Sequence, residues 1–287
     1  MTPNDLNLTV ESQEEYRAQD KDFLTSTLLK AFLENPRLFQ KHRAGQIPHE
    51  EKKAFTDGTA AHTMMLEGVA EFDRRYAIKS LDGRTAEGKA WKEMVERESL
   101  IVLDEKTGDM LCRMWAEFQC HPVAPRLLSS GFPELVARAD YLGYPCQVKV
   151  DWLHFGLLLA DRRSVNVLID YKTCKDVKRF FYDAKKLRYI NSLSYYKEVL
   201  NLALPPEHRI DTVVVIFQEK KEPYTVGVWY VHINDLETAR LENEDAILGK
   251  YNPLTDSREG GIIECGRTGI YPTGYEEIRT MELLKRR

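Results

Sequence analysis

The sequence contains few cysteines, and none of them is placed for a covalent or metal-binding framework. The five (Cys112, Cys120, Cys146, Cys174 and Cys265) are scattered along the chain, and no two of them form a C-x-x-C pair. Such spacing argues against a disulfide scaffold and against a zinc or iron–sulfur site. It predicts reduced thiols and a cytoplasmic location.

Long apolar runs and an excess of positive charge are also lacking. No stretch of about 18 apolar residues occurs, which argues against a membrane span. The opening residues MTPNDLNLTVESQEEY lack the basic and then apolar pattern of a signal peptide. Because the formal net charge is -4, a nucleic-acid site in this chain would have to be a local patch.

What the chain does contain is typical of a globular protein. Its 287 residues are 43% hydrophobic and 30% charged, which suffices for one large domain or two small ones with a sizeable core. We expect a polar, flexible lead-in over residues 1–22 and a single domain over residues 23–287.

The first part of that domain, residues 23–125, has a mainly helical pattern. Thr25 or Ser26 can cap a helix whose apolar residues recur at helical spacing, and Asn35-Pro36 ends it. A second helix is expected after Gly58, and residues 86–120 have a helical pattern throughout.

The pattern changes over residues 126–287, where short alternating runs end at turns. The order β-β-β-α-β-β predicts an α/β fold with a central mixed β-sheet flanked by helices, and the N-terminal helical region folds onto it. The expected elements are a hairpin over 133–156, a strand over 165–173, one long helix over 177–204, a hairpin over 211–232, a late helix over 233–251 and an ordered, extended tail GRTGIYPTGYEEI.

The strand over 165–173 ends in opposite charges. Its apolar run VNVLI predicts a central strand that is covered on both faces. Charges rarely lie in such a place unless they are paired or bound to a metal. Asp170 and Lys172 are two positions apart and share one face. One interpretation is an ordinary salt bridge at the rim of the sheet.

A second acid favours a chemical role. Asp151 ends the preceding strand, 19 positions before Asp170, so two carboxylates would lie side by side. A cation relieves their repulsion, and oxygen ligands of this kind suit Mg²⁺ or Mn²⁺. The backbone carbonyl of Tyr171 can add a ligand. Lys172 can orient or help deprotonate a water, or neutralise a developing oxyanion, which together predicts metal-assisted phosphodiester hydrolysis.

At these residues the chain resembles the PD-(D/E)xK nuclease superfamily, and within it the exodeoxyribonuclease VIII (RecE) type of recombination exonuclease. The likeness runs from about residue 23 to about residue 276. It is carried by an ordered set of segments: LTSTLLKAFLENPRLFQKHRAG, GTAAHTMMLEG, GRTAEGKAW, HPVAPRLLSSGFPELVARADY, CQVKVDWL, VLIDYKT and RTGIYPTGY.

The resemblance implies roles for individual residues. His62, in the G-T-x-x-H segment, matches a metal-site histidine, and Glu134 matches an acid on the first hairpin strand. Asp151 and Asp170 match the metal carboxylates, and Lys172 matches the catalytic lysine. Two alternatives stay open: a helix histidine bonded to a carbonyl for His62, and an exposed strand acid for Glu134.

One departure concerns the helix after the lysine strand, where these nucleases usually carry a glutamine a few residues before a tyrosine. Tyr196 fits the tyrosine, but Ser192 stands where the glutamine is expected. The missing amide puts one contact near the scissile phosphate in doubt. A neighbour such as Asn191 could replace it, or substrate handling and activity could differ.

Basic side chains cluster around that helix. They alternate with Phe180, Phe181 and Tyr182, which can stack on bases or wedge a duplex end. The alternative is a solvated basic face with buried aromatics. The predicted DNA-binding residues are Lys175, Lys178, Arg179, Lys185, Lys186 and Arg188, with Arg84 and Lys89 from a second basic stretch.

The resemblance implies a Mg²⁺-dependent exonuclease of a bacterial or phage-infected cell, with Mn²⁺ as a substitute. Such an enzyme degrades linear double-stranded DNA from 5′ to 3′ and leaves 3′ single strands for phage-type homologous recombination. A ring-shaped homo-oligomer and a single-strand annealing (RecT-like) partner are also implied. Two alternatives are a structure-specific or defence-associated endonuclease and a non-catalytic DNA-binding protein, which Ser192 favours and the intact Asp151, Asp170 and Lys172 oppose.

Overall fold

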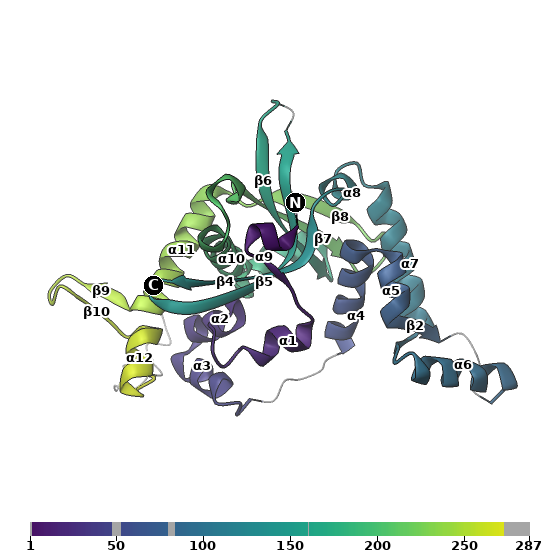
Figure 1. Ribbon diagram of the computed structural model, residues 1–287, viewed down its shortest axis with the longest axis horizontal. Helices are drawn as coiled ribbons and strands as arrows, with labels where there is room; N and C mark the ends of the chain where they lie inside the picture. The colour runs from purple at the N-terminus through teal and green to yellow at the C-terminus, as the bar shows by residue number, and fades with distance from the viewer. Residues whose placement is uncertain (1, 48–52, 80–83, 160, 273–287) are drawn as a thin grey trace, which may run out of the picture.

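The computed structural model describes residues 2–47, 53–79, 84–159 and 161–272 (Figure 1). A six-stranded sheet lies at its centre, in the order β1-β4-β5-β6-β7-β8. Neighbouring strands are antiparallel except β6 and β7, which are parallel. The predicted mixed sheet is therefore confirmed. Its strands are β1 (Thr9–Val10), β4 (Phe132–Tyr141), β5 (Tyr144–Leu158), β6 (Ser164–Cys174), β7 (Thr212–Glu219) and β8 (Val226–Tyr230).

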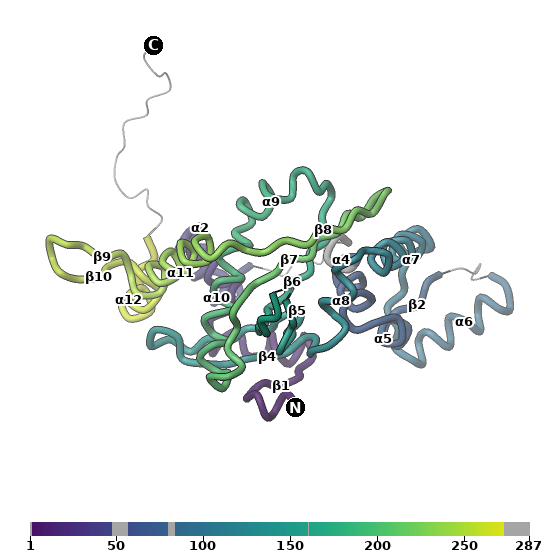
Figure 2. The backbone as a smooth tube through the Cα atoms, turned by 90° about the horizontal axis from the view of Figure 1, so that it is seen from above, coloured from purple at the N-terminus to yellow at the C-terminus, as the bar shows by residue number. Residues whose placement is uncertain are grey.

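Helices cover both faces of this sheet, as the sequence predicted. In Figure 2, α10 and α11 lie on one side of the strands and α4 and α7 on the other. The α-helices are α1 (Gln13–Ala18), α2 (Ser26–Glu34), α3 (Pro36–Arg43), α4 (Lys53–His62), α5 (Val69–Arg75), α6 (Ala86–Arg97), α7 (Glu105–Cys120), α8 (Ala124–Leu127), α9 (Phe180–Lys186), α10 (Tyr189–Ala203), α11 (Ile233–Leu248) and α12 (Ile262–Thr268).

Shorter elements complete the chain. The 3-10 helices η1 (Pro3–Leu6), η3 (Val177–Arg179) and η4 (Pro206–His208) occupy connections, and the π-helix η2 (Thr63–Glu67) directly follows α4. Two small two-stranded sheets pair β2 (Tyr76–Lys79) with β3 (Ile101–Asp104), and β9 (Lys250–Asn252) with β10 (Ser257–Glu259).

The central strand β6 is buried from both sides, which is why its sequence is an apolar run rather than an alternation. Leu168 packs in the core beneath α2 and α10. Ile169 and Tyr171 pack in a second core beneath α4 and α7. Since side chains alternate along a strand, Asp170 and Lys172 belong to the same face as Leu168.

The first helical region begins as the sequence predicted. Thr25 caps α2 by accepting a hydrogen bond from the amide of Leu28. Asn35 ends α2 and caps α3, in which Pro36 takes the first position. A proline at that position suits a helix start because the missing N–H has no intrahelical partner there.

Residues 1–22 differ from the expected flexible lead-in. Thr9 and Val10 form β1 and pair with β4, while Leu6 and Leu8 are almost completely buried in the core beneath α2 and α10. Two buried leucines and a strand pairing hold this segment against the sheet. The mostly polar composition of residues 1–22 did not indicate these contacts.

The helical predictions also require corrections. The expected helix over 177–204 is divided into η3, α9 and α10, and Arg188, with a left-handed φ of 51°, separates α9 from α10. Residues 86–120 contain strand β3 between α6 and α7, and the second helix already includes residues before Gly58. The tail expected to be extended begins inside α12, and residues 273–287 lie outside the described residues.

No helix in the part of the chain that the structure describes combines the length and apolar character that a membrane span needs.

Candidate metal centre and active site

The site lies where the ladder of the central sheet is interrupted. In the β4–β5 register, Pro133 pairs with Trp152 and Leu135 with Val150, so Glu134 faces Asp151 between these pairs. Glu134 has a φ of 53°, a left-handed backbone that is uncommon for a non-glycine residue. Strained residues of this kind gather at functional sites.

Strands β5 and β6 also separate here. Their register runs from the hairpin tip to the pair Trp152–Ile169, and Asp170 follows that pair. Just beyond it, Oδ2 of Asp151 accepts a 2.8 Å hydrogen bond from the amide of Tyr171. A side-chain oxygen thus binds an amide that faces β5, and the carboxylate is fixed between the two strands.

Lys172 reaches both carboxylates. Its Nζ donates a 2.8 Å hydrogen bond to Oδ1 of Asp170 and lies 3.5 Å from Oδ2 of Asp151. The ion pair of the simpler interpretation therefore exists. However, Asp170 is only 3% exposed, whereas the Lys172 side chain is 27% exposed, so the acid of this pair is buried in the sheet and the lysine is half-buried.

Three ligand atoms gather next to this lysine. One atom each of His62, Glu134 and Asp151, which we call the ligand triad, lie within 4.8 Å of one another. His62 ends α4 where the chain widens into the π-helix η2, and such widenings are frequent at functional sites. Its Nδ1 lies 3.7 Å from Oδ2 of Asp151. Asp170, also predicted as a ligand, stands outside this group and instead accepts the hydrogen bond from Lys172.

The pKa values of the three acids of the site are shifted in different directions. Burial, reinforced by the charge of Asp151, raises the pKa of Glu134 to about 7, although Lys149 lies 3.3 Å away. Burial raises the pKa of Asp170 to about 6. Burial also acts on Asp151, but the charge of Lys172 and the hydrogen bond from the Tyr171 amide act against it, and the Asp151 pKa lies below its usual value. Crowded carboxylates of this kind favour a bound cation.

The two bases of the site respond in opposite directions. Burial lowers the pKa of His62, which favours the neutral imidazole that ligates metals. The charge of Asp151 and the backbone of Tyr171 act in the opposite direction on the His62 pKa, but burial outweighs them. Burial acts against the charge of Lys172, but Asp151 and Asp170 outweigh it and raise the Lys172 pKa. A lysine that keeps its proton suits charge neutralisation better than proton abstraction.

The α2 and α10 side of the site supplies further groups. The hydroxyl of Tyr196 accepts a hydrogen bond from Ser26, and the charges of Lys172 and Asp170 act on it. Lys30, on α2, was missed by the sequence analysis. Burial lowers its pKa, and so does the charge of Lys172, while Asp170 acts in the opposite direction. The available signal was a lysine between the buried Leu29 and Ala31.

Asn191 does not replace the glutamine expected at Ser192. Its side-chain amide donates to Glu242 and to Asn243, and its backbone oxygen accepts from Asn243. These bonds direct Asn191 toward α11 and away from Lys172. The buried hydroxyl of Ser192 has no hydrogen-bond partner among the described residues.

The predicted DNA-binding residues divide into three groups. Those of the α9 region lie together and are exposed: Lys175, Lys178, Arg179, Lys185 and Lys186. Arg188 is instead drawn to Glu242, 3.5 Å away, and to the carbonyl of Leu33. Arg84 and Lys89 lie at or near α6, which lies apart from α9 in both views (Figures 1 and 2), so the fold does not bring them to α9.

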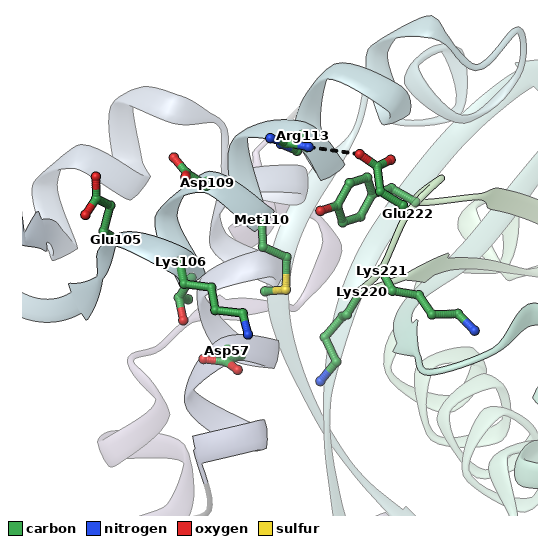
Figure 3. A pocket seen from close by; sticks show the side chains of 11 residues that line it. Asp57, Glu105, Lys106, Asp109, Met110, Arg113, Lys220, Lys221 and Glu222 are labelled. Atoms are coloured by element: carbon green, nitrogen blue, oxygen red, sulfur yellow. Dashed lines mark hydrogen bonds and ion pairs between the residues drawn. The ribbon is translucent and has the colours of Figure 1, made fainter.

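One hollow of the described surface is separate from the ligand triad. It has a volume of about 780 Å³ and lies between α4, α7 and the turn that joins β7 and β8 (Figure 3). Its lining mixes acids with Lys106, Lys220 and Lys221. A smaller hollow of about 320 Å³ shares Lys221 and is lined by Lys175 and Arg179. Basic side chains thus continue from α7 toward α9.

Comparison with known proteins identifies the family. Residues 25–249 match the model of the PDDEXK-like domain of unknown function (DUF3799). The chain belongs to this family. The match includes every member of the ligand triad, together with Asp170 and Lys172. No curated protein matches the chain.

A solved structure shares this fold. A candidate exonuclease from Eubacterium rectale superimposes with a TM-score of 0.59 at 12% sequence identity, covering 82% of this chain and 83% of that one. A phage-related exonuclease from Haemophilus somnus 129PT is 12% identical and covers 77% of this chain and 89% of that one, with a TM-score of 0.32 that is too low to carry an argument. The PD-(D/E)xK fold predicted from the sequence is therefore confirmed.

The donor set of the ligand triad fits a divalent cation. Two carboxylates and one imidazole suit the hard or borderline ions that PD-(D/E)xK nucleases use. The donors alone do not select one metal, because Mg²⁺ and Mn²⁺ both accept this set.

Proposed function

We propose that this PDDEXK-like family member is a divalent-metal-dependent deoxyribonuclease that hydrolyses phosphodiester bonds at the ends of linear double-stranded DNA. One observation carries the proposal. A ligand triad of His62, Glu134 and Asp151 adjoins an ammonium group, that of Lys172, which contacts both Asp151 and Asp170. The regular pairing of the strands is interrupted at this point, and the three ligand atoms lie within 4.8 Å of one another.

The residues divide the work between them. A cation bound by the ligand triad supplies Lewis acidity toward the phosphate and lowers the pKa of a bound water. Neutral His62 offers a ring nitrogen. Asp170 holds Lys172 in position through the 2.8 Å hydrogen bond, and the protonated Lys172 neutralises negative charge as it develops on the phosphate oxygens.

Substrate phosphates also need cations that do not touch the reacting atoms. Lys30 is partly buried, carries no ion pair within the described residues, and experiences the charges of Lys172 and Asp170. A partly desolvated ammonium attracts phosphate more strongly than a fully hydrated one. We assign Lys30 to a phosphate next to the scissile one.

The finer features rest on the resemblance to RecE-type enzymes. These are exonucleolytic action from 5′ to 3′, Mg²⁺ as the natural metal, a role in phage-type recombination, a ring-shaped oligomer and an annealing partner. The candidate exonuclease from Eubacterium rectale, which shares the fold, supports exonucleolytic rather than internal cleavage.

The test uses linear duplex DNA labelled at the 5′ or the 3′ end, with Mg²⁺, Mn²⁺ or EDTA. We expect metal-dependent release of the 5′ label first, and loss of activity in Asp170→Ala and Lys172→Ala. Asp161→Ala is the matched control, because Asp161 lies at the exposed tip of the β5–β6 hairpin and should leave cleavage unchanged.

Covalently closed circular duplex separates exonuclease from endonuclease. An exonuclease leaves the circle intact, whereas nicking or linearisation favours the endonuclease. Undiminished cleavage by Asp170→Ala would remove the site assignment. DNA binding without metal-dependent cleavage would support the non-catalytic alternative.

A further inference from the structure

Two aromatic side chains of α9 are exposed to solvent although both are large and apolar. Phe181 is 64% exposed and Tyr182 is 61% exposed, whereas the neighbouring Phe180 is 4% exposed. Single exposed apolar residues are ordinary. Two consecutive exposed aromatic rings beside a candidate nuclease site offer a surface to a flat, apolar partner group.

The Phe181 ring is held in a fixed orientation. It stacks on Trp229 of β8 with a centroid separation of 3.9 Å and an interplanar angle of 8°. Trp229 in turn packs on Phe217, which also stacks on Phe180. Gly227 makes this possible, because a Cβ there would lie 1.9 Å from the Phe217 ring. The core thus supports Phe181 from one side and leaves its other face to solvent.

The surroundings of these rings are basic, unlike the molecule as a whole. Residues 175–188 contain six basic and two acidic side chains, while the whole chain has a net charge of -4. Arg179 lies over the Tyr182 ring, 5.8 Å from its centroid. The smaller hollow adjoins the same segment, and its lining has three basic side chains and two acidic ones: Lys175, Arg179, Lys221, Asp176 and Asp183. An occupant of this surface would therefore carry negative charge together with flat apolar groups.

The surface is also connected to the catalytic residues. Phe180 contacts Tyr189 at a centroid distance of 6.1 Å. Burial raises the pKa of Tyr189, and its hydroxyl also experiences the charges of Lys172 and Asp170. A short run of contacts thus joins Phe181 to the site.

We propose that Phe181 and Tyr182 form a stacking platform for nucleobases of the DNA strand that passes the active site. This inference rests on the proposed nuclease function. It adds that the protein recognises unpaired or unstacked bases of the substrate, in addition to the phosphate that reacts. Backbone phosphates next to those bases lie against the basic side chains of α9. Aromatic rings accept any base because every base has a π-face, so the platform grips DNA without reading its sequence.

Single-stranded oligonucleotides that carry 2-aminopurine at one position test the proposal directly. With Ca²⁺ in place of Mg²⁺, to limit cleavage, we expect the wild-type protein to quench the fluorophore at one or two positions. Phe181→Ala and Tyr182→Ala should relieve this quenching and weaken binding by about 5- to 100-fold, the range expected for the loss of one stacked base. Phe181→Trp should keep both the quenching and the affinity of the wild type.

An abasic nucleotide at the quenched position supplies a second readout that misfolding cannot imitate. The abasic change should weaken binding to the wild type, but should cost nothing further in the double variant Phe181→Ala/Tyr182→Ala, because the base then has no ring to stack on. Tyr251→Ala is the matched control. Tyr251 is 55% exposed on the β9–β10 hairpin, away from α9, and its loss should leave binding unchanged.

The outcomes of this experiment can be distinguished. Normal metal-dependent cleavage by the wild type, combined with unchanged quenching and affinity in Phe181→Ala and Tyr182→Ala, overturns the platform and leaves the nuclease intact. Base-specific quenching that the two variants abolish, without any cleavage by the wild type, supports the platform and overturns the nuclease. A change in molar mass by light scattering in the variants, with unchanged DNA affinity, makes the patch a contact between copies of the chain and overturns the platform.

Discussion

The backbone amide of Tyr171 donates a 2.8 Å hydrogen bond to Oδ2 of Asp151. The carboxylate that contributes to the ligand triad therefore also ties β5 to β6 where their ladder ends. A ligand held in this way is oriented before any cation arrives, which lowers the cost of assembling the site. Asp151 therefore has two roles. Accepting the hydrogen bond from Tyr171 needs only a side-chain oxygen, whereas attracting a cation needs the negative charge.

The variant Asp151→Asn tests these two roles separately. Asparagine keeps an oxygen that can accept the Tyr171 amide but removes the charge that attracts a cation. We expect a melting temperature within a few degrees of the wild type and a loss of cleavage on the order of 1,000-fold, because several kcal/mol of metal-derived stabilisation disappear. Calorimetry and label release measure the two effects. Cleavage within ten-fold of the wild type would contradict the assignment, and Asp161→Asn is the control.

Lys172→Met should separate metal binding from catalysis. The variant removes the cation between Asp151 and Asp170, so the site becomes more negative and Mn²⁺ should bind at least as tightly as in the wild type. Cleavage should nevertheless fall by a factor of 100 or more, since nothing neutralises the developing phosphate charge. Lys172→Arg should not rescue it, because a planar guanidinium does not replace a compact ammonium.

Titration calorimetry with Mn²⁺ and end-label release, performed on the same preparations, provide the measurement. Loss of Mn²⁺ binding together with activity would mean that Lys172 only maintains the structure of the site. Lys250→Met, at an exposed position of β9, controls for the loss of a charge.

The strands of the sheet could be predicted from the sequence because the patterns that indicate them lie within short segments. Alternation over residues 134–150 and an apolar run before Asp170 gave β4, β5 and β6, and the turn residues Leu142 and Gly143 both have the positive φ that the hairpin needs. The nearness of Asp151 and Asp170 also followed, since it needed only adjacent strands.

Other features depend on contacts that no local pattern contains. Residues 179–203 suit a helix, yet Arg188 interrupts it next to Glu242 of α11 and a carbonyl of α2. Lys30 looked like one more exposed lysine on a helix until α2 packed beside Lys172. Asn191 looked like a substitute for the missing glutamine until α11 occupied its amide.

Glu134→Gln should stabilise the metal-free protein, and the effect should depend on pH. The folded-state pKa of Glu134 is raised from 4.5 to about 7 by burial and by Asp151. A raised acid pKa means that folding favours the protonated form. Ionisation of Glu134 therefore lowers the free energy of unfolding. The whole of this penalty is present above about pH 7, and it disappears as the pH falls below about 4.5.

Urea unfolding in EDTA at pH 8 and pH 5 measures this prediction. At pH 8 we expect the glutamine variant to exceed the wild type in free energy of unfolding by up to about 3 kcal/mol, since each pKa unit corresponds to about 1.4 kcal/mol. The difference should shrink at pH 5. A variant that is less stable than the wild type at pH 8 would show that the ion pair with Lys149 outweighs burial.

Lys30→Gln should weaken substrate binding more than it slows the chemical step. If Lys30 holds a phosphate beside the scissile one, its removal deletes one charge contact, and the slope of log affinity against log salt should decrease in magnitude by about 1. We expect KM to rise about ten-fold, because one charge-assisted contact is lost, and kcat to change less than three-fold. Lys30→Arg should retain most of the affinity. Lys41→Gln, on the exposed face of α3, should change neither constant. An unchanged salt slope would remove Lys30 from the phosphate path, and a fall in kcat alone would place it with the reacting atoms instead.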